Sequence, residues 1–222
     1  MYVRILKIVA ACAALAVGGC GGGDGGPPPP PPSFTTQIYS DPALDGDIQQ
    51  TSPSTYVVTQ GMSPTVQTVF AGIDPASQTE FRAFLTFPLT GSGGVPLNAS
   101  IDSASVEILV DDLQPPSGQL PLLVELVSFQ PPTLLATDFD RTAQPPIASV
   151  RLSVPVSASD VGTLVPIDVT PLMVQAQRLG LDDFQIRIME DVGPAIPVLM
   201  EIDDSTGPDR TKRAPLLTVT YF

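Results

Sequence analysis

The chain has 222 residues, of which 43% are hydrophobic, and it contains 26 prolines but no histidine or tryptophan. Ten basic and twenty-three acidic residues give a formal net charge of −13, which makes nucleic acid and anionic lipid headgroups poor partners. Without histidine, Ser-His-Asp triads and most zinc sites are excluded, while the length suffices for one domain with a sizeable core.

The first residues are typical of a bacterial lipoprotein signal peptide that covers residues 1–19. Arg4 and Lys7 precede an apolar run at 8–17, and small residues then lead to Cys20. In sequences that resemble this one, the cysteine at that position is the diacylglycerol acceptor, so we expect a membrane anchor at Cys20. An uncleaved anchor or an ordinary signal peptide is the alternative. Because no aspartate follows Cys20, the resemblance implies delivery to the outer membrane of a Gram-negative cell.

Residues 20–33 are predicted to be a tether between that anchor and the domain. A glycine-rich stretch comes first, and the six prolines at 27–32 would span about 20 Å as an extended left-handed helix. The proline run could instead be a docking ligand for a partner domain. Removal of residues 1–19 takes away Cys12 and leaves a formal charge of −15, and with Cys20 acylated no disulfide can form in the mature chain.

Residues 34–222 are predicted to form an all-β domain, an antiparallel β-sandwich or jelly roll with one short helix. Stretches of β-forming residues alternate there with turn-forming Pro, Gly, Asn and Asp at short intervals. Pairs of prolines at 115–116, 131–132 and 145–146 mark loops. The predicted strands are 34–39, 55–59, 65–71, 80–89, 101–111, 120–128, 147–153, 164–168, 183–190, 196–202 and 216–222, with 120–128 and 183–190 expected at the centre.

The segments 80–89 and 101–111 are expected to be two long antiparallel strands around which the core forms. In the first, alternation places Leu85 on the core face and Arg82 and Thr86 on the opposite face, with Phe84 as an exception. In the second, Val106 and its alternate neighbours face the same core. Both strands are therefore predicted to have one buried and one solvent-facing side.

One helix is predicted at 171–179. Thr170 is a suitable capping residue, Pro171 suits the first helical position, and Gly180 suits a left-handed exit from the helix. Its apolar residues do not form a perfect stripe, which favours a helix that closes one end of the sandwich.

Four segments in chain order match the motifs of a known family: Arg82 at the start of a long strand, Ser103-Ala104-Ser105-Val106, Asp168-Val169-Thr170 before the helix, and Arg213-Ala214-Pro215-Leu216 at the last strand. In these segments, and over nearly the whole mature chain, the sequence resembles the DNRLRE-type β-sandwich module, which is grouped with carbohydrate-binding modules and is related to a disaggregatase domain. The resemblance implies a β-sandwich that binds carbohydrate.

The chain departs from this family in its aromatic residues. Where the family often carries a tryptophan, the segment 128–146 has only Phe129 and Phe139. Outside the signal peptide the tyrosines are Tyr39, Tyr56 and Tyr221. Because sugar sites commonly stack a pyranose on an aromatic ring, this departure weakens the expectation of a stacked sugar.

Carboxylates are the remaining candidates for chemistry. Asp41, Asp45 and Asp47 lie close together with Gly46 in a predicted loop, where oxygen ligands could hold a structural calcium ion; the alternative is that they are ordinary turn residues. The adjacent pairs Asp111-Asp112, Asp182-Asp183 and Asp203-Asp204 are expected to be turn residues as well, since neighbours on a strand point to opposite faces and make poor catalytic pairs.

These features predict a membrane-tethered, non-enzymatic lipoprotein of the cell envelope that binds an envelope or extracellular polysaccharide. The alternative is a structural or assembly module that binds another envelope protein. No catalytic residues are predicted, and calcium is the only cofactor considered.

Overall fold

A computed structural model describes residues 31–191 and 196–222. The predicted signal peptide, Cys20 and the tether up to residue 30 lie outside the described residues. Residues 32–222 group into one unit. Within the described ranges, no helix is long and apolar enough to span a bilayer.

The described residues are mostly antiparallel β-structure, as the sequence predicts. The strands are β1 Phe34–Tyr39, β2 Gly46–Ser52, β3 Thr55–Gln60, β4 Thr68–Ile73, β5 Glu80–Pro88, β6 Ile101–Gln114, β7 Gln119–Leu120, β8 Leu122–Val127, β9 Ala148–Arg151, β10 Val156–Ser157, β11 Leu164–Asp168, β12 Asp183–Glu190, β13 Leu199–Asp203 and β14 Leu216–Tyr221. The helices are α1 Thr170–Leu179 and the single turn α2 Arg210–Arg213, with 3-10 turns η1 Ala136–Phe139 and η2 Ala158–Asp160.

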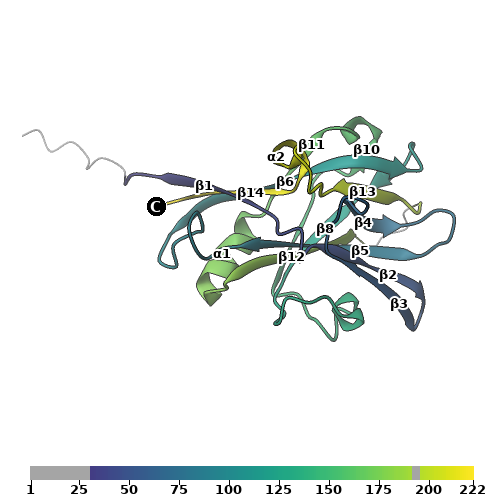
Figure 1. Cartoon of the computed structure of the whole chain (residues 1–222), viewed down its shortest axis with the longest axis horizontal. Helices are drawn as coiled ribbons and strands as arrows, with labels where there is room; N and C mark the ends of the chain where they lie inside the picture. Colours follow the sequence, from purple (N-terminus) through teal and green to yellow (C-terminus); the bar gives the residue numbers. More distant parts are fainter. Residues whose placement is uncertain (1–30, 192–195) are drawn as a thin grey trace, which may run out of the picture. The chain divides into compact units, whose positions relative to one another are not determined.

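One large curled sheet contains most of these strands, in the order β1-β14-β6-β13-β4-β5-β12-β8-β9. Strand β11 pairs with β6, and the β2–β3 hairpin joins the sheet at β5; β7 and β10 form a separate pair. The long strand β6 pairs with β14 and β11 over its first part and with β13 over its last part. Because the sheet curls, its β14–β6–β11 part lies over its β5–β12–β8 part (Figure 1).

The main core fills the space between these two parts of the sheet. The alternating apolar residues of β5 and β6 face it, including Leu85 and Val106, both fully buried. Ile186 of β12 and Val124 of β8 face it as well; both strands are paired on each side, although β8 lies next to the edge strand β9 and not at the centre of the sheet. Strands β5 and β6 do not pair with each other: β5 pairs with β2, β4 and β12, so the expected neighbours meet across the core instead.

The second face of β5 is also buried, and here the prediction of a solvent-facing side is wrong. Thr86 is 2% exposed and Arg82 is 8% exposed. The segment 128–146 covers this face, and Ile48 of the neighbouring strand β2 joins Phe84, Leu134 and Phe139 in a second, smaller core there. Phe84, the exception in the sequence pattern, was therefore the residue that signalled this second core.

Two arginines fasten the segment 128–146 to the sheet. The guanidinium of Arg82 lies 3.9 Å from the ring centroid of Phe139 and donates a hydrogen bond to its carbonyl oxygen. Arg187 is fully buried, donates to Oε2 of Glu125 at 2.6 and 2.9 Å, and donates to the carbonyl of Asp138 at 2.6 Å. Arg141 of the covering segment lies 2.6 Å from Oε1 of Glu125. These charged contacts replace the water that a bare sheet surface would bind.

Helix α1 lies where the sequence predicts it, with one correction at its start. It begins at Thr170, which is itself helical, so its hydroxyl does not cap the helix and instead accepts a hydrogen bond from the Ala104 amide at 2.9 Å. Gly180 ends the helix at φ 62°, as expected. Leu172, Met173 and Ala176 form its buried side, which packs mainly against β6 and β9.

Some other elements differ from the prediction. The sequence pattern missed β2, because residues 46–52 begin with the Gly-Asp pair that signals a turn and continue with polar residues. It also missed α2, a single turn between β13 and β14. The two-residue strand β10 was missed as well. The remaining strands agree with the prediction to within a few residues, except that the segment 120–128 is divided between β7 and β8.

Candidate ligand-binding groove

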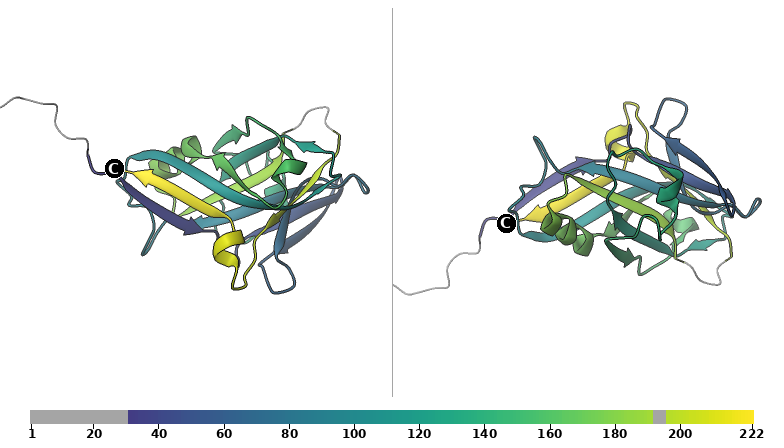
Figure 2. Two further views of the ribbon diagram at one scale, coloured as in Figure 1. Left: turned by 90° about the horizontal axis from the view of Figure 1, so that it is seen from above. Right: turned by 90° about the horizontal axis from the view of Figure 1, so that it is seen from below.

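The outer face of the β1–β14–β6–β11 part of the sheet carries a regular array of polar side chains. Antiparallel register places Gln37, Thr218, Ser105 and Asp168 in one row across the four strands. A second row contains Thr35, Thr220 and Ser103. The inward-facing residues between them, such as Val106 and Val219, are buried in the core, so the period of two in these strands separates a packing face from a hydrogen-bonding face. Figure 2 shows β1, β14 and β6 side by side.

A groove of about 440 Å³ crosses this face, and its volume is in the range of small-ligand sites. It is lined by Ser103, Ala104, Ser105, Pro166, Asp168, Thr170, Thr218 and Thr220. Among the described residues, the hydroxyls of Ser103, Ser105 and Thr218 have no hydrogen-bond partner, whereas that of Thr220 lies 3.2 Å from the hydroxyl of Thr35. The groove therefore presents free donors and acceptors on a rigid sheet.

Asp168 places a charged group at one side of this groove. It is the last residue of β11, and its Oδ1 accepts a hydrogen bond from the amide of Thr170 at 2.9 Å. Hydrogen bonds from the Thr170 hydroxyl and then from its amide hold the pKa of Asp168 below its usual value. This carboxylate is therefore ionised and oriented at neutral pH, and it can accept hydrogen bonds from a ligand hydroxyl.

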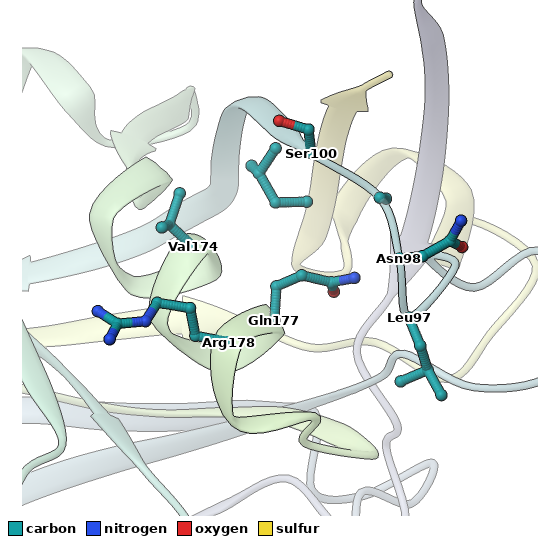
Figure 3. Close-up of a pocket in the computed structure, with 8 residues that line it drawn as sticks. Leu97, Asn98, Ser100, Val174, Gln177 and Arg178 are labelled. Carbon is teal, nitrogen blue, oxygen red and sulfur yellow. The ribbon is translucent and has the colours of Figure 1, made fainter.

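A second pocket, of about 340 Å³, lies between α1 and the segment that leads into β6. Its lining includes Val174, Gln177 and Arg178 of the helix; Figure 3 shows Gln177 pointing toward Asn98, while Arg178 extends away from it. The Gln177 amide donates to the carbonyl of Pro96 at 2.5 Å, so its polar end is already engaged. Leu97 is 69% exposed, and this pocket is smaller than the groove and has no carboxylate among its lining residues.

The calcium candidates are not gathered in an open loop. Asp45 and Asp47 are buried, Asp47 lies within β2, and Asp41 accepts a hydrogen bond from the amide of Ala43 in a turn. Within residues 31–191 and 196–222, no group of three or more acidic, histidine or cysteine side chains is arranged to hold a metal ion. Asp41 and Asp45 lie in the turn between β1 and β2, so the predicted loop is wrong for Asp47 alone, and calcium binding stays a prediction that this geometry does not favour.

Asp45 instead meets Asp204, a contact that no sequence spacing signals. Oδ1 of Asp45 accepts from the amide of Thr86 at 2.7 Å, and Oδ1 of Asp204 accepts from Arg210 at 3.1 Å and from Ser40 at 3.3 Å. Both carboxyl groups are buried, and neither Oδ2 has a hydrogen-bond partner among the described residues. Burial of two neighbouring carboxyl groups favours a proton on one of them. Burial, followed by the charge of Asp204, raises the pKa of Asp45 well above its usual value.

The adjacent acidic pairs are also placed differently from the prediction. Asp111 and Asp112 lie inside β6, and Asp203 ends β13, so these residues do not form turns. Asp203 accepts hydrogen bonds from Arg213 and from Ser205, and it fastens α2 to the sheet. Only Asp182-Asp183 lies at a turn, where it leads into β12. Because Asp204 is fully buried, the Asp45–Asp204 pair does not face the groove.

The aromatic residues give little stacking surface at the groove. Tyr56 packs on Phe139, with ring centroids 5.2 Å apart, and Tyr39 donates its hydroxyl hydrogen bond to the carbonyl of Thr211 at 3.0 Å. Phe34, which is 55% exposed, stacks on Tyr221 at 5.9 Å at the start of β1. The groove would therefore bind a ligand mainly through hydrogen bonds.

The fold and the groove define a class: an all-β protein with a curled antiparallel sheet and a hydroxyl-lined outer face. A scan against protein-family models and a search of curated proteins each find no match to this chain. The resemblance to the DNRLRE-type module therefore stays a prediction. The residues that match its motifs make specific contacts here: Arg82 lies over the ring of Phe139, Asp168 accepts a hydrogen bond from Thr170 beside the groove, and Arg213 donates a hydrogen bond to Asp203.

Proposed function

We propose that this chain is a lipid-anchored, non-enzymatic module of the bacterial cell envelope that binds a polysaccharide in the groove on β14, β6 and β11. The observation that carries the proposal is the row of Thr218, Ser105 and Asp168, which combines two free hydroxyls with an oriented carboxylate on a rigid surface. Sugar hydroxyls both donate and accept hydrogen bonds, and this row offers partners for both. The family resemblance supports the same class of ligand.

The charge of the domain narrows the class of polysaccharide. The mature chain would have a formal charge of −15, and Asp168 adds a negative charge in the groove itself. An acidic polymer such as alginate would be repelled at low ionic strength. A neutral polysaccharide is therefore the better ligand.

Affinity electrophoresis through gels that contain dextran, xylan, alginate or solubilised peptidoglycan tests this proposal. We expect retardation in at least one gel with a neutral polymer, and we expect the variant Thr218→Val with Ser105→Ala to lose it, since both changes remove a hydroxyl and keep a similar shape. The matched control is Thr137→Val, an exposed threonine of η1 outside the groove. If no polymer retards the protein, or if the double variant binds as well as the control, polysaccharide binding in this groove is refuted.

The lipid anchor is tested separately, with Cys20→Ser. Acyl transfer to the thiol precedes cleavage in lipoprotein maturation as the resemblance implies it, so the variant should keep its signal peptide and lose incorporation of a labelled fatty acid. Membrane fractionation and labelling report the result. A variant that is still acylated and processed would show that Cys20 is not the anchor.

A further inference from the structure

Strand β3 is an edge strand that lacks the usual protection against pairing. It pairs only with β2, and the described residues place no strand on its other side. Edge strands present a row of unpaired backbone amides and carbonyls, and proteins commonly protect them with charged residues, prolines or coverage by a loop. Strand β3, with the sequence Thr-Tyr-Val-Val-Thr-Gln, contains none of these residues.

The other three edges of the sheet carry such protection. Strand β9 has four residues and includes Arg151, which binds Asp191 at 2.5 Å. Strand β11 has Pro166 in its middle, which removes a backbone donor. Beside β1 lies the loop at residue 93, whose Gly93 carbonyl accepts a hydrogen bond from Thr36 at 2.7 Å. The contrast marks β3 as the edge that is left open.

Two neighbouring valines give β3 an exposed apolar side chain on each of its faces. Val57 is 48% exposed and Val58 is 37% exposed. Valine favours the strand conformation, so both residues support the strand while they leave apolar surface in contact with solvent. Tyr56 is held against Phe139 and Gln50, which fixes the strand in place. A strand that is rigid, open along its backbone and apolar on both faces fits one kind of partner, a further β-strand.

The distribution of charge indicates which strand that partner would supply. Residues 48–73 contain no Asp, Glu, Lys or Arg, in a chain whose formal charge is −13. Two copies of so acidic a chain repel each other over most surfaces, and they can approach most closely where both are uncharged. Two antiparallel β3 strands related by a two-fold axis bring these uncharged segments together, and such an isologous contact is the commonest form of self-association.

We propose that two copies of this chain associate through antiparallel pairing of their β3 strands, which joins their sheets into one continuous sheet. This contact is independent of the groove, since β3 joins the sheet through β2 and β5, whereas the groove lies on β14, β6 and β11. A dimer would then present two grooves at once.

Cross-linking of the complete chain in its own membranes tests the proposal. A cysteine is introduced by Val57→Cys, and a bismaleimide is added, so that the two copies are captured whichever register they adopt. The matched control is Val154→Cys, an apolar residue that is 70% exposed and lies between β9 and β10. We expect a covalent dimer from Val57→Cys and little from the control or from the parent chain.

A second substitution on the same strand separates pairing from chance collision. Val58→Lys, added to Val57→Cys, places a charge at the interface and should abolish the dimer, while an unchanged circular dichroism spectrum shows that the domain is folded. Equal cross-linking at positions 57 and 154, or a dimer that survives Val58→Lys, overturns the proposal. Cross-linking of Val57→Cys to a different protein alone also overturns it, because β3 would then accept a foreign strand.

Discussion

Asp47 should make the stability of the domain fall as the pH rises. It is 3% exposed within β2, and burial raises its pKa from 3.8 to about 7, with a contact to the backbone of Phe70 only partly offsetting this effect. In the unfolded chain the same carboxyl has its ordinary pKa, so it ionises there first. The contribution to stability is complete below about pH 3.8 and is lost as the pH rises through about 7.

The magnitude follows from the two pKa values. At about 1.36 kcal/mol per pH unit, the difference between 3.8 and about 7 corresponds to about 4 kcal/mol over the whole range. Between about pH 5 and about pH 8 the same linkage gives about 2.5 kcal/mol, since part of the loss occurs below pH 5. That is a large share of the roughly 5–15 kcal/mol by which a domain is stable.

Urea unfolding at about pH 5 and about pH 8 measures the effect. Far-UV circular dichroism is the suitable signal, because the chain contains no tryptophan. We expect Asp47→Asn to remove about 2.5 kcal/mol of the pH dependence and to leave the part that comes from Asp45 and Asp204. The surface control Asp102→Asn should keep the full dependence. If Asp47→Asn and the parent lose the same stability between the two pH values, Asp47 does not ionise as we describe.

Three further substitutions test the packing. Thr86→Asp should destabilise the domain by about 3 kcal/mol or more, because the new carboxylate is buried beside Asp45. The control is Thr90→Asp at an exposed position. Equal melting temperatures for the two variants would contradict the burial of the second face of β5. Arg187→Met should lower the free energy of unfolding, measured in urea, by about 3–5 kcal/mol, since Glu125 loses its main partner. Adding Glu125→Leu should restore much of that loss. Additive losses in the double variant would show that the two side chains are not coupled. Gly46→Ala should destabilise by about 1–3 kcal/mol, because its Cβ would collide with the carbonyl of Thr59, and an unchanged melting temperature would rule out that close approach of β2 and β3.

The periodic parts of this fold could be predicted from the sequence because one buried face repeats every second residue. The apolar positions of β6, β8 and β12 agree with the structure for this reason. Strand β2 could not be predicted in the same way, because Asp47 is polar and yet buried. A hydrophobic pattern does not indicate which polar residues are buried. The cover on β5 escaped prediction because segment 128–146 contacts it across a long sequence separation.

The groove was only partly accessible to sequence reasoning. Ser105 and Asp168 were noted as family motif residues, but their alignment in one row with Thr218 depends on the register between β14, β6 and β11. Register follows from how the whole sheet closes, and no local signal contains it. The Asp45–Asp204 pair escaped for the same reason, because both partners lie far apart in the chain and each alone is typical of a turn.

The pairing of β1 with β14 determines when this domain can finish folding. Thr35 and Thr220, separated by 185 positions, lie 3.2 Å apart in this pair, and β14 in turn completes the edge of β6. The sheet therefore cannot close until the residues near 220 have been synthesised, and such distant contacts form slowly. A nascent chain can therefore complete this sheet only after nearly all of its length is available for pairing.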